Sequence, residues 1–140
     1  MAIKLGMEAK LYYGTAGATA TTELTNVKDV TLNLETGEAD VTTRGNQGWR
    51  ATVATLKNGS VEFEMIWDTG DAGFTAIQQA YFNNTAIALA ILDGANGEGL
   101  DADFSITNFT RNEPLEEAMT VSVTAKPTYS TRAPAWVTGS

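Results

Sequence analysis

The stretch SVEFEMIWD, residues 60–68, alternates apolar and polar side chains with a period of two. Successive side chains of a β-strand point to opposite faces, so this stretch predicts a strand with two different faces. The apolar face consists of Val61, Phe63, Met65 and Trp67. The other face carries Glu62 and Glu64. This acidic face is either simply exposed to water or exposed to a polyanion that the surface must not bind.

Further segments have the composition of strands. They are IKLGMEAKLYY (3–13), VKDVTLNLE (27–35), the nearly all-apolar AIALAILDG (86–94), DADFSITNFTR (101–111) and EEAMTVSVTAKP (116–127). The apolar run predicts a strand that is buried on both faces. In DADFSITNFTR, Phe104 and Ile106 alternate with Asp103 and Ser105, which predicts that Asp103 lies on a wet face.

One segment changes period. In DTGDAGFTAIQQAYFNN (68–84), the apolar residues recur at helical spacing, with Thr69 or Asp71 as the N-cap and Asn83–Asn84 at the end. Many short strands and one helix predict a single domain over residues 1–140. We expect a mainly β fold, a small β-sandwich or barrel with one flanking α-helix, a long inter-strand loop and extended terminal arms.

The segment 36–59 is long, polar and short of apolar periodicity. Loops longer than about 12–15 residues without structure of their own are uncommon in compact domains and usually have a function. This one contains Arg44, Trp49 and Arg50, and Trp and Arg are enriched at the centres of protein interfaces. We therefore predict that these three residues, with Trp136 of the polar tail, contact neighbouring subunits.

The chain has 9 basic and 17 acidic side chains, a net charge of −8, and neither cysteine nor histidine. Cysteine-free chains have no disulfides and no thiolate metal sites. The lack of histidine removes the commonest general base, and the negative charge makes direct phosphate binding unfavourable. No apolar run has the length of a signal or a membrane span, so we expect synthesis in the cytoplasm of the producing cell and no membrane partner.

The sequence argues against two kinds of chemical site, a pair of catalytic acids and a calcium site. Glu62 and Glu64 would lie about 7 Å apart on one strand face, a spacing that suits paired glycosidase acids, but such pairs usually sit in a cleft built by several loops. The acidic turn DGANGEGLDAD (93–103) offers oxygen ligands for calcium, but its spacing does not match a calcium-binding loop. We expect no enzymatic activity, no metal and no cofactor.

Two blocks of the chain resemble a known family. VKDVTLNLETGEADVTTRGNQGWRATVATLKNGSVEFEMIWD and the later ITNFTRNEPLEEAMTVSVTAKPTYS are similar to the tail tube (major tail) protein family of long-tailed bacteriophages. The resemblance runs from about Ile3 to Trp136 and rests on ordered blocks, without a catalytic signature. It implies six-fold rings that stack into a hollow tube in the virion, through which DNA passes without specific binding. Tape-measure, tail terminator and tail-tip proteins are the implied partners.

In such proteins the long segment, here Thr36–Gly59, reaches onto neighbouring subunits. The terminal arms, here Met1–Lys4 and Thr128–Ser140, bridge stacked rings. A lumen that lets DNA slide must repel phosphate, so we expect Glu62 and Glu64 to line it. The face with Thr120, Ser122 and Thr124 competes for that role.

The sequence is also compatible with two alternative functions. One is a tube or ring protein of a contractile tail or a secretion system. The other is a monomeric carbohydrate-binding β-sandwich, for which Trp49 and Trp136 would form the aromatic platform.

Overall fold

The structure is a computed structural model that describes residues 5–95, 97–128 and 132–138. In chain order the described elements are η1 (Gly6–Glu8), β1 (Lys10–Thr15), β2 (Thr22–Glu23), β3 (Val27–Asp40), η2 (Arg44–Asn46), β4 (Thr52–Ile66), α1 (Ala72–Phe82), β5 (Ile87–Leu92), β6 (Gly99–Asn112), β7 (Thr120–Pro127) and β8 (Ala135–Val137).

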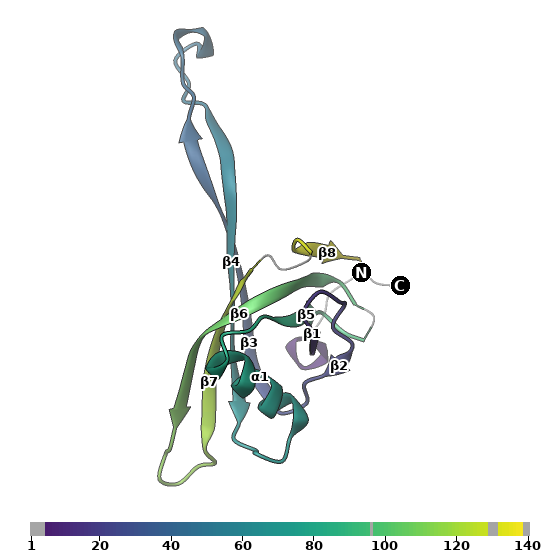
Figure 1. The fold of residues 1–140 in the computed structure, drawn as a ribbon. Coiled ribbons are helices and arrows are strands. Elements are labelled where there is room, and N and C mark those ends of the chain that lie inside the picture. The colour runs from purple at the N-terminus through teal and green to yellow at the C-terminus, as the bar shows by residue number, and fades with distance from the viewer. Residues whose placement is uncertain (1–4, 96, 129–131, 139–140) are drawn as a thin grey trace.

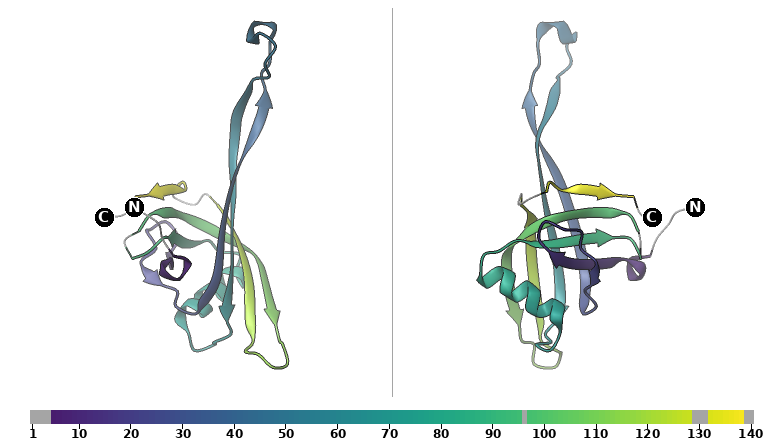
Figure 2. Two further views of the ribbon diagram at one scale, coloured as in Figure 1. Left: turned by 180° about the vertical axis from the view of Figure 1, so that it is seen from behind. Right: turned by 45° about the vertical axis from the view of Figure 1, so that its right-hand side comes forward.

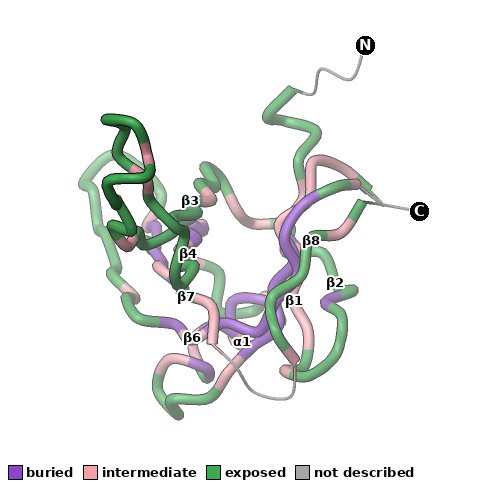
Figure 3. Tube along the Cα trace, turned by 90° about the horizontal axis from the view of Figure 1, so that it is seen from above, coloured by how far each residue is buried: buried purple, intermediate pink, exposed green. Residues whose placement is uncertain are grey.

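These strands form one curled sheet with the order β2-β1-β5-β6-β7-β4-β3, and β8 pairs with β6 beside this path. All the pairings are antiparallel. The sheet wraps around its own core, and α1 packs inside the curl (Figures 1 and 3). The prediction of a mainly β fold with one helix is confirmed, and the sheet is closer to half a barrel than to two stacked sheets.

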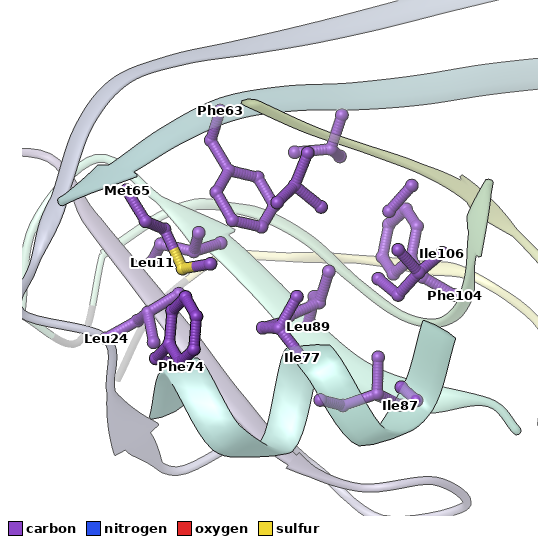
Figure 4. Close-up of a cluster of buried hydrophobic side chains, with 14 of the residues drawn as sticks. Leu11, Leu24, Phe63, Met65, Phe74, Ile77, Ile87, Leu89, Phe104 and Ile106 are labelled. Atoms are coloured by element: carbon purple, nitrogen blue, oxygen red, sulfur yellow. The ribbon is translucent and has the colours of Figure 1, made fainter. Parts of the chain in front are cut away.

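The apolar face of the opening stretch lies in the core. Val61, Phe63 and Met65 of β4 are buried, and they meet Phe74 and Ile77 of α1 in a cluster that Figure 4 shows from close by. Burial of large apolar side chains contributes about 1.5–3 kcal/mol each. The alternation in the sequence therefore gives the correct inner face for this strand.

Helix α1 begins and ends where its sequence predicts. The carboxylate of Asp71 accepts the Phe74 N–H at 2.9 Å, which satisfies one of the free donors of the first turn. At the other end Asn83 is the C-cap, and Asn84 has a positive φ of 53°. Asp71, one of the two predicted N-caps, is thus the residue that caps the helix.

The long inter-strand segment is mostly strand. β3 and β4 continue beyond the body as a two-stranded arm (Figures 1 and 2), in which Asp40 pairs with Thr52 and Thr36 with Lys57. Only residues 41–51 lie between the two strands, so the expected loop over 36–59 is much shorter than predicted. The arm is exposed on both faces, and an arm without a buried face has no reason to alternate.

The two ends of the chain also differ from the strand expectations. The predicted first strand over 3–13 starts only at Lys10, because residues 6–8 form a 3₁₀ turn. The polar tail contains the short strand β8, in which Trp136 pairs with Leu100. Residues 1–4, 129–131 and 139–140 lie outside the described residues, so the predicted arm Met1–Lys4 and part of the arm Thr128–Ser140 are not described.

Candidate functional surfaces

One face of the sheet is polar, and it carries both predicted lumen glutamates. In the pairing of β4 with β7, Glu62 lies opposite Thr124 and Glu64 lies opposite Ser122. Residues that are directly opposite in an antiparallel pair have their side chains on the same face. The two faces that competed for the lumen are therefore one face, to which β4 and β7 both contribute.

This polar face extends to the strands on either side. Thr31 of β3 lies opposite Glu62, and Asn108 and Thr110 of β6 lie opposite Thr124 and Ser122. The hydroxyl of Thr110 donates to Asn108 Oδ1 at 2.6 Å. Thr120, which was also predicted for this face, is buried at its end.

The charge of the polar face is mostly negative. Glu62 is exposed and Glu64 is half-buried, and Glu35 lines a shallow hollow of the same face together with Lys126. The hollow is otherwise lined by Asn33, Asn58, Gly59 and Ser60. Such a surface of carboxylates, amides and hydroxyls is well hydrated and unfavourable for phosphate. Glu62 and Glu64 thus lie on an open sheet face, where paired catalytic acids are not usually found.

The arm ends in a compact tip that brings three of the predicted interface residues together. Arg44, Trp49 and Arg50 line one shallow hollow there, and the Trp49 side chain is 78% exposed. Gln47 and Gly48 have positive φ angles of 54° and 87°, which turn the chain back toward β4.

Hydrogen bonds hold the base of this tip. The Asp40 carboxylate accepts the Thr42 N–H at 2.9 Å, and the Ala51 N–H donates to Thr42 Oγ1 at 2.9 Å. The hydroxyl and then the N–H of Thr42 lower the pKa of Asp40 below its ordinary value. The tip is thus an ordered platform that presents one aromatic ring and two guanidinium groups to solvent.

Trp136 lies apart from the tip. Its Nε1–H donates to Glu98 Oε1 at 2.8 Å, and the ring lines a groove at the base of the arm with Leu34, Leu100 and Pro127. The structure therefore does not bring Trp49 and Trp136 into one aromatic platform, which removes the feature that favoured the carbohydrate-binding alternative.

A buried acidic pair was missed at the sequence level. Asp101 and Asp103 of β6 are 4% and 0% exposed, although alternation placed Asp103 on a wet face. Arg132 Nε donates to Asp103 Oδ1 at 2.9 Å, and Arg132 Nη2 donates to Asp101 Oδ1 at 3.0 Å. Asp103 also accepts the Gly17 N–H. The prediction for Asp103 is wrong because the C-terminal segment covers this side of β6.

Other neighbours of the acidic pair give a weak signal in the sequence. Asp101 and Asp103 lie opposite Ala90 and Ala88 of β5, two buried small residues that leave room for a covering segment. A run of acidic residues opposite alanines in a strand buried on both faces points to a distant cation. The sequence alone does not say which of the nine basic side chains this is.

The carboxylates that suggested calcium are used elsewhere. Asp93 Oδ1 accepts the Glu98 N–H at 2.8 Å and closes the turn, whereas Asp101 and Asp103 bind Arg132. In the described ranges no group of three or more acidic residues is placed to hold a metal ion. Nor do they include a helix long and apolar enough to cross a membrane.

Comparison with known proteins identifies a family. The family model described as "Phage tail tube protein" matches residues 8–128. No curated protein matches the chain.

Several solved structures share the fold. A chain from the tail of an empty gene transfer agent particle has a TM-score of 0.78 and 13% identity, covering 99% of this chain and all of that one. The SPP1 tail tube protein has a TM-score of 0.73 and 17% identity, covering 99% of this chain and 80% of that one. A chain of the anti-feeding prophage baseplate has a TM-score of 0.64 and 5% identity, covering 99% of this chain and 97% of that one.

Proposed function

This chain belongs to the phage tail tube protein family, and we propose that it assembles into stacked hexameric rings that form a hollow tube through which DNA passes. The observation that carries the proposal is the match of the family over residues 8–128 of 140. The gene transfer agent tail, a similar structure, was computed with C6 symmetry, which supports the number six. The protein is then a structural part of a virion tail, made in the host cytoplasm.

The strand directions of the body fit ring formation. β6, β7, β4 and β3 lie side by side in alternating directions. Because this set has an even number of strands, β3 and β6 at its two ends run in opposite directions. Rotation about an axis roughly along the strands preserves each direction, so β3 of one copy meets β6 of the next as an antiparallel partner. Repeating this step closes a cylinder and removes the exposed edges.

The polar face then lines the lumen. The core face of the sheet is covered by α1 and the rest of the body, so the face with Glu62 and Glu64 is the one left for the bore. Repeated around each ring, the two carboxylates form acidic bands, and the low-dielectric walls of a narrow channel strengthen their field. DNA would pass such a wall without binding to it.

The arm and the chain ends serve contacts along the tube axis. Between Glu35 and Asp40 the paired strands add roughly 17 Å beyond the body, at about 3.3 Å per residue. The tip with Arg44, Trp49 and Arg50 then reaches the next ring. We extend the proposal to tape-measure, tail terminator and tail-tip proteins as partners that the family implies at the two ends of the tube.

Electron microscopy of the purified protein tests this function directly. We expect rings or tubes in negative stain at high protein concentration, with light scattering that rises as the concentration rises. A protein that stays monomeric at every concentration and ionic strength would contradict the proposal.

The likeness to the anti-feeding prophage baseplate chain favours a second candidate, the tube protein of a contractile apparatus. It predicts the same assemblies, so microscopy does not separate the two. Neighbouring genes for a sheath and a baseplate would support the second candidate, and tape-measure and terminator genes without a sheath would support the first.

A further inference from the structure

Three aromatic side chains form a patch where α1 ends. Phe82 is 66% exposed in the last turn of the helix. Its ring lies 5.3 Å from the Tyr81 ring and 6.5 Å from the Phe109 ring, and Tyr81 stacks on Phe109 at 5.9 Å. Tyr81 and Phe109 are half-buried and pack against the core, so they hold the exposed Phe82 ring in place. A single exposed apolar residue needs no explanation, but an exposed aromatic ring supported by two others is a feature that suits a contact site.

The patch lies beside an open strand edge. β5 pairs with β6 as far as Ile87 and Phe104. From Ser105 to Asn112, β6 pairs with β7 on one side, and no described strand pairs with its other side. Phe109 is opposite Val123, a buried residue, so its ring is on the core face of the sheet beside this edge.

The opposite edge of the same sheet carries a row of apolar side chains. Val30 and Leu34 of β3 are 37% and 56% exposed, and Leu32 between them is half-buried. They lie on the core face, because Val30 is opposite Phe63 and Leu32 is opposite Val61. Among the described strands, β3 has β4 as its sole partner, so this apolar row follows a second open edge.

The two edges are at matching heights on the body. Cross-strand partners form one continuous row from Val30 through Phe63 and Val123 to Phe109. A second copy whose β3 lies along the open part of β6 continues this row, with its apolar side chains facing the patch. Within one chain the two ends of the row are three strand spacings apart, about 14 Å, so neither end can cover the other.

We propose that the patch of Tyr81, Phe82 and Phe109 is a docking site for the apolar row of β3 from a second copy of this chain. The contact lies outside the lumen, behind the strand pairing, and it makes the lateral interface two layers thick. Backbone pairing alone tolerates register slips, whereas side chains that pack on one face specify the register. The inference rests on the proposed function, since it names the residues through which neighbours in a ring recognise one another.

The first test is Phe82→Ser, with Leu115→Ser as its matched control. Leu115 is 98% exposed on the turn between β6 and β7, outside the patch. We expect both variants to keep the melting temperature of the wild type. Phe82→Ser should raise the concentration needed for ring formation about tenfold or more, the scale of an aromatic hot spot. Leu115→Ser should assemble like the wild type.

The second test uses the absence of native cysteine. Val30→Cys and Phe82→Cys are made as separate chains, mixed, assembled and treated with a short bismaleimide. A covalent dimer that forms in the mixture, and in neither variant alone, supports the docking site. A mixture of Leu115→Cys with Val30→Cys is the control and should give no such dimer.

The outcomes separate the inference from the function. If the wild type forms tubes, Phe82→Ser forms them equally well and no cross-link appears, the docking site is wrong and the tube function stands. If the wild type never assembles, the tube function fails and the docking site fails with it.

Discussion

At the scale of single residues, the contact of Asp101 and Asp103 with Arg132 contributes to the stability of the fold. Removing one partner from a buried ion pair typically costs about 3–5 kcal/mol, because the remaining charge is left buried. We expect Arg132→Met to lower the free energy of unfolding by about 3 kcal/mol, the low end, since Asp103 keeps the Gly17 N–H. Urea unfolding measures this difference, and the exposed Arg44→Met is the control without an effect.

The pH dependence of this pair follows from the Arg132 pKa. Partial burial alone would lower that pKa, but hydrogen bonds and charges of Asp101 and Asp103 outweigh burial and raise it. A raised pKa means that the stabilisation is complete below the unfolded-state pKa and is lost only as the pH rises through the folded-state value. The difference between wild type and Arg132→Met should therefore stay constant from about pH 7 to pH 10. A difference that shrinks over this range would contradict the assignment.

The glutamates proposed to line the lumen, Glu62 and Glu64, give a second prediction at this scale. Glu62→Lys with Glu64→Lys should leave the fold intact, because neither side chain is in the core. Tubes should still form, but DNA should now adhere to them and be released by salt, as phosphate contacts are. The matched control is Glu116→Lys with Glu117→Lys, the same charge change on the exposed turn between β6 and β7. If DNA passes through the variant tubes unchanged, the glutamates are only solvated and do not keep the lumen free of DNA. If the variant does not assemble, the glutamates belong to a subunit interface.

Alternation predicted individual residues well where one face is buried and the other is wet. It placed Val61, Phe63 and Met65 in the core, and it separated Glu62 and Glu64 from them. It failed for Asp103, because in a strand covered on both faces a polar residue opposite the core face is not exposed to water. The residue that covers Asp103 is Arg132, 29 positions further along the chain. A contact of that range has no local signal.

At the scale of elements, the arm of β3 and β4 carries the prediction for Trp49. Its side chain is 78% exposed, so the body loses little when it is removed. We expect Trp49→Ala to keep the wild-type free energy of unfolding and to weaken ring stacking by on the order of 2 kcal/mol. Sedimentation of tubes against free subunits measures the stacking.

Trp67→Ala is the matched control for this prediction. The Trp67 ring packs against Phe74 at 4.9 Å, and Arg111 lies 5.1 Å from its centre. Its removal should therefore destabilise the subunit itself, by about 3 kcal/mol. If Trp49→Ala unfolds the subunit instead, the tip is part of the fold and its role in stacking is wrong.

The elements differ in how well the sequence predicts them. Helix α1 was predictable to within its caps, because the Asp71 carboxylate accepts an N–H of the first turn and Asn84, just past the helix end, adopts the positive φ that asparagine tolerates. The arm was predictable as a long, unusual segment but not as strands, because both of its faces are wet and its residues have no period. β8 was not predictable, since a strand of three residues depends on the β6 backbone that it joins.

At the scale of the whole molecule, the net charge of −8 controls when subunits meet. Like-charged subunits repel one another across a Debye length that is about 30 Å at 0.01 M salt and about 10 Å at 0.1 M. Assembly should therefore increase as salt rises through this range. Light scattering at fixed protein concentration measures it, and a decrease with salt would mean that attraction between opposite charges dominates the contacts.

The arm also has a mechanical consequence. β3 and β4 run from the wall of the body into the arm, in 14 and 15 residues, joined by an antiparallel pairing whose register shifts between Val27 and Val30 and again between Thr36 and Glu38. A pull on the tip along the strands loads many hydrogen bonds of this pairing together in shear, whereas a pull across the strands would open them one at a time. A tail that is stretched or bent applies its force along the axis. The arm is therefore expected to transmit tension into the wall of its own ring rather than to peel away from it.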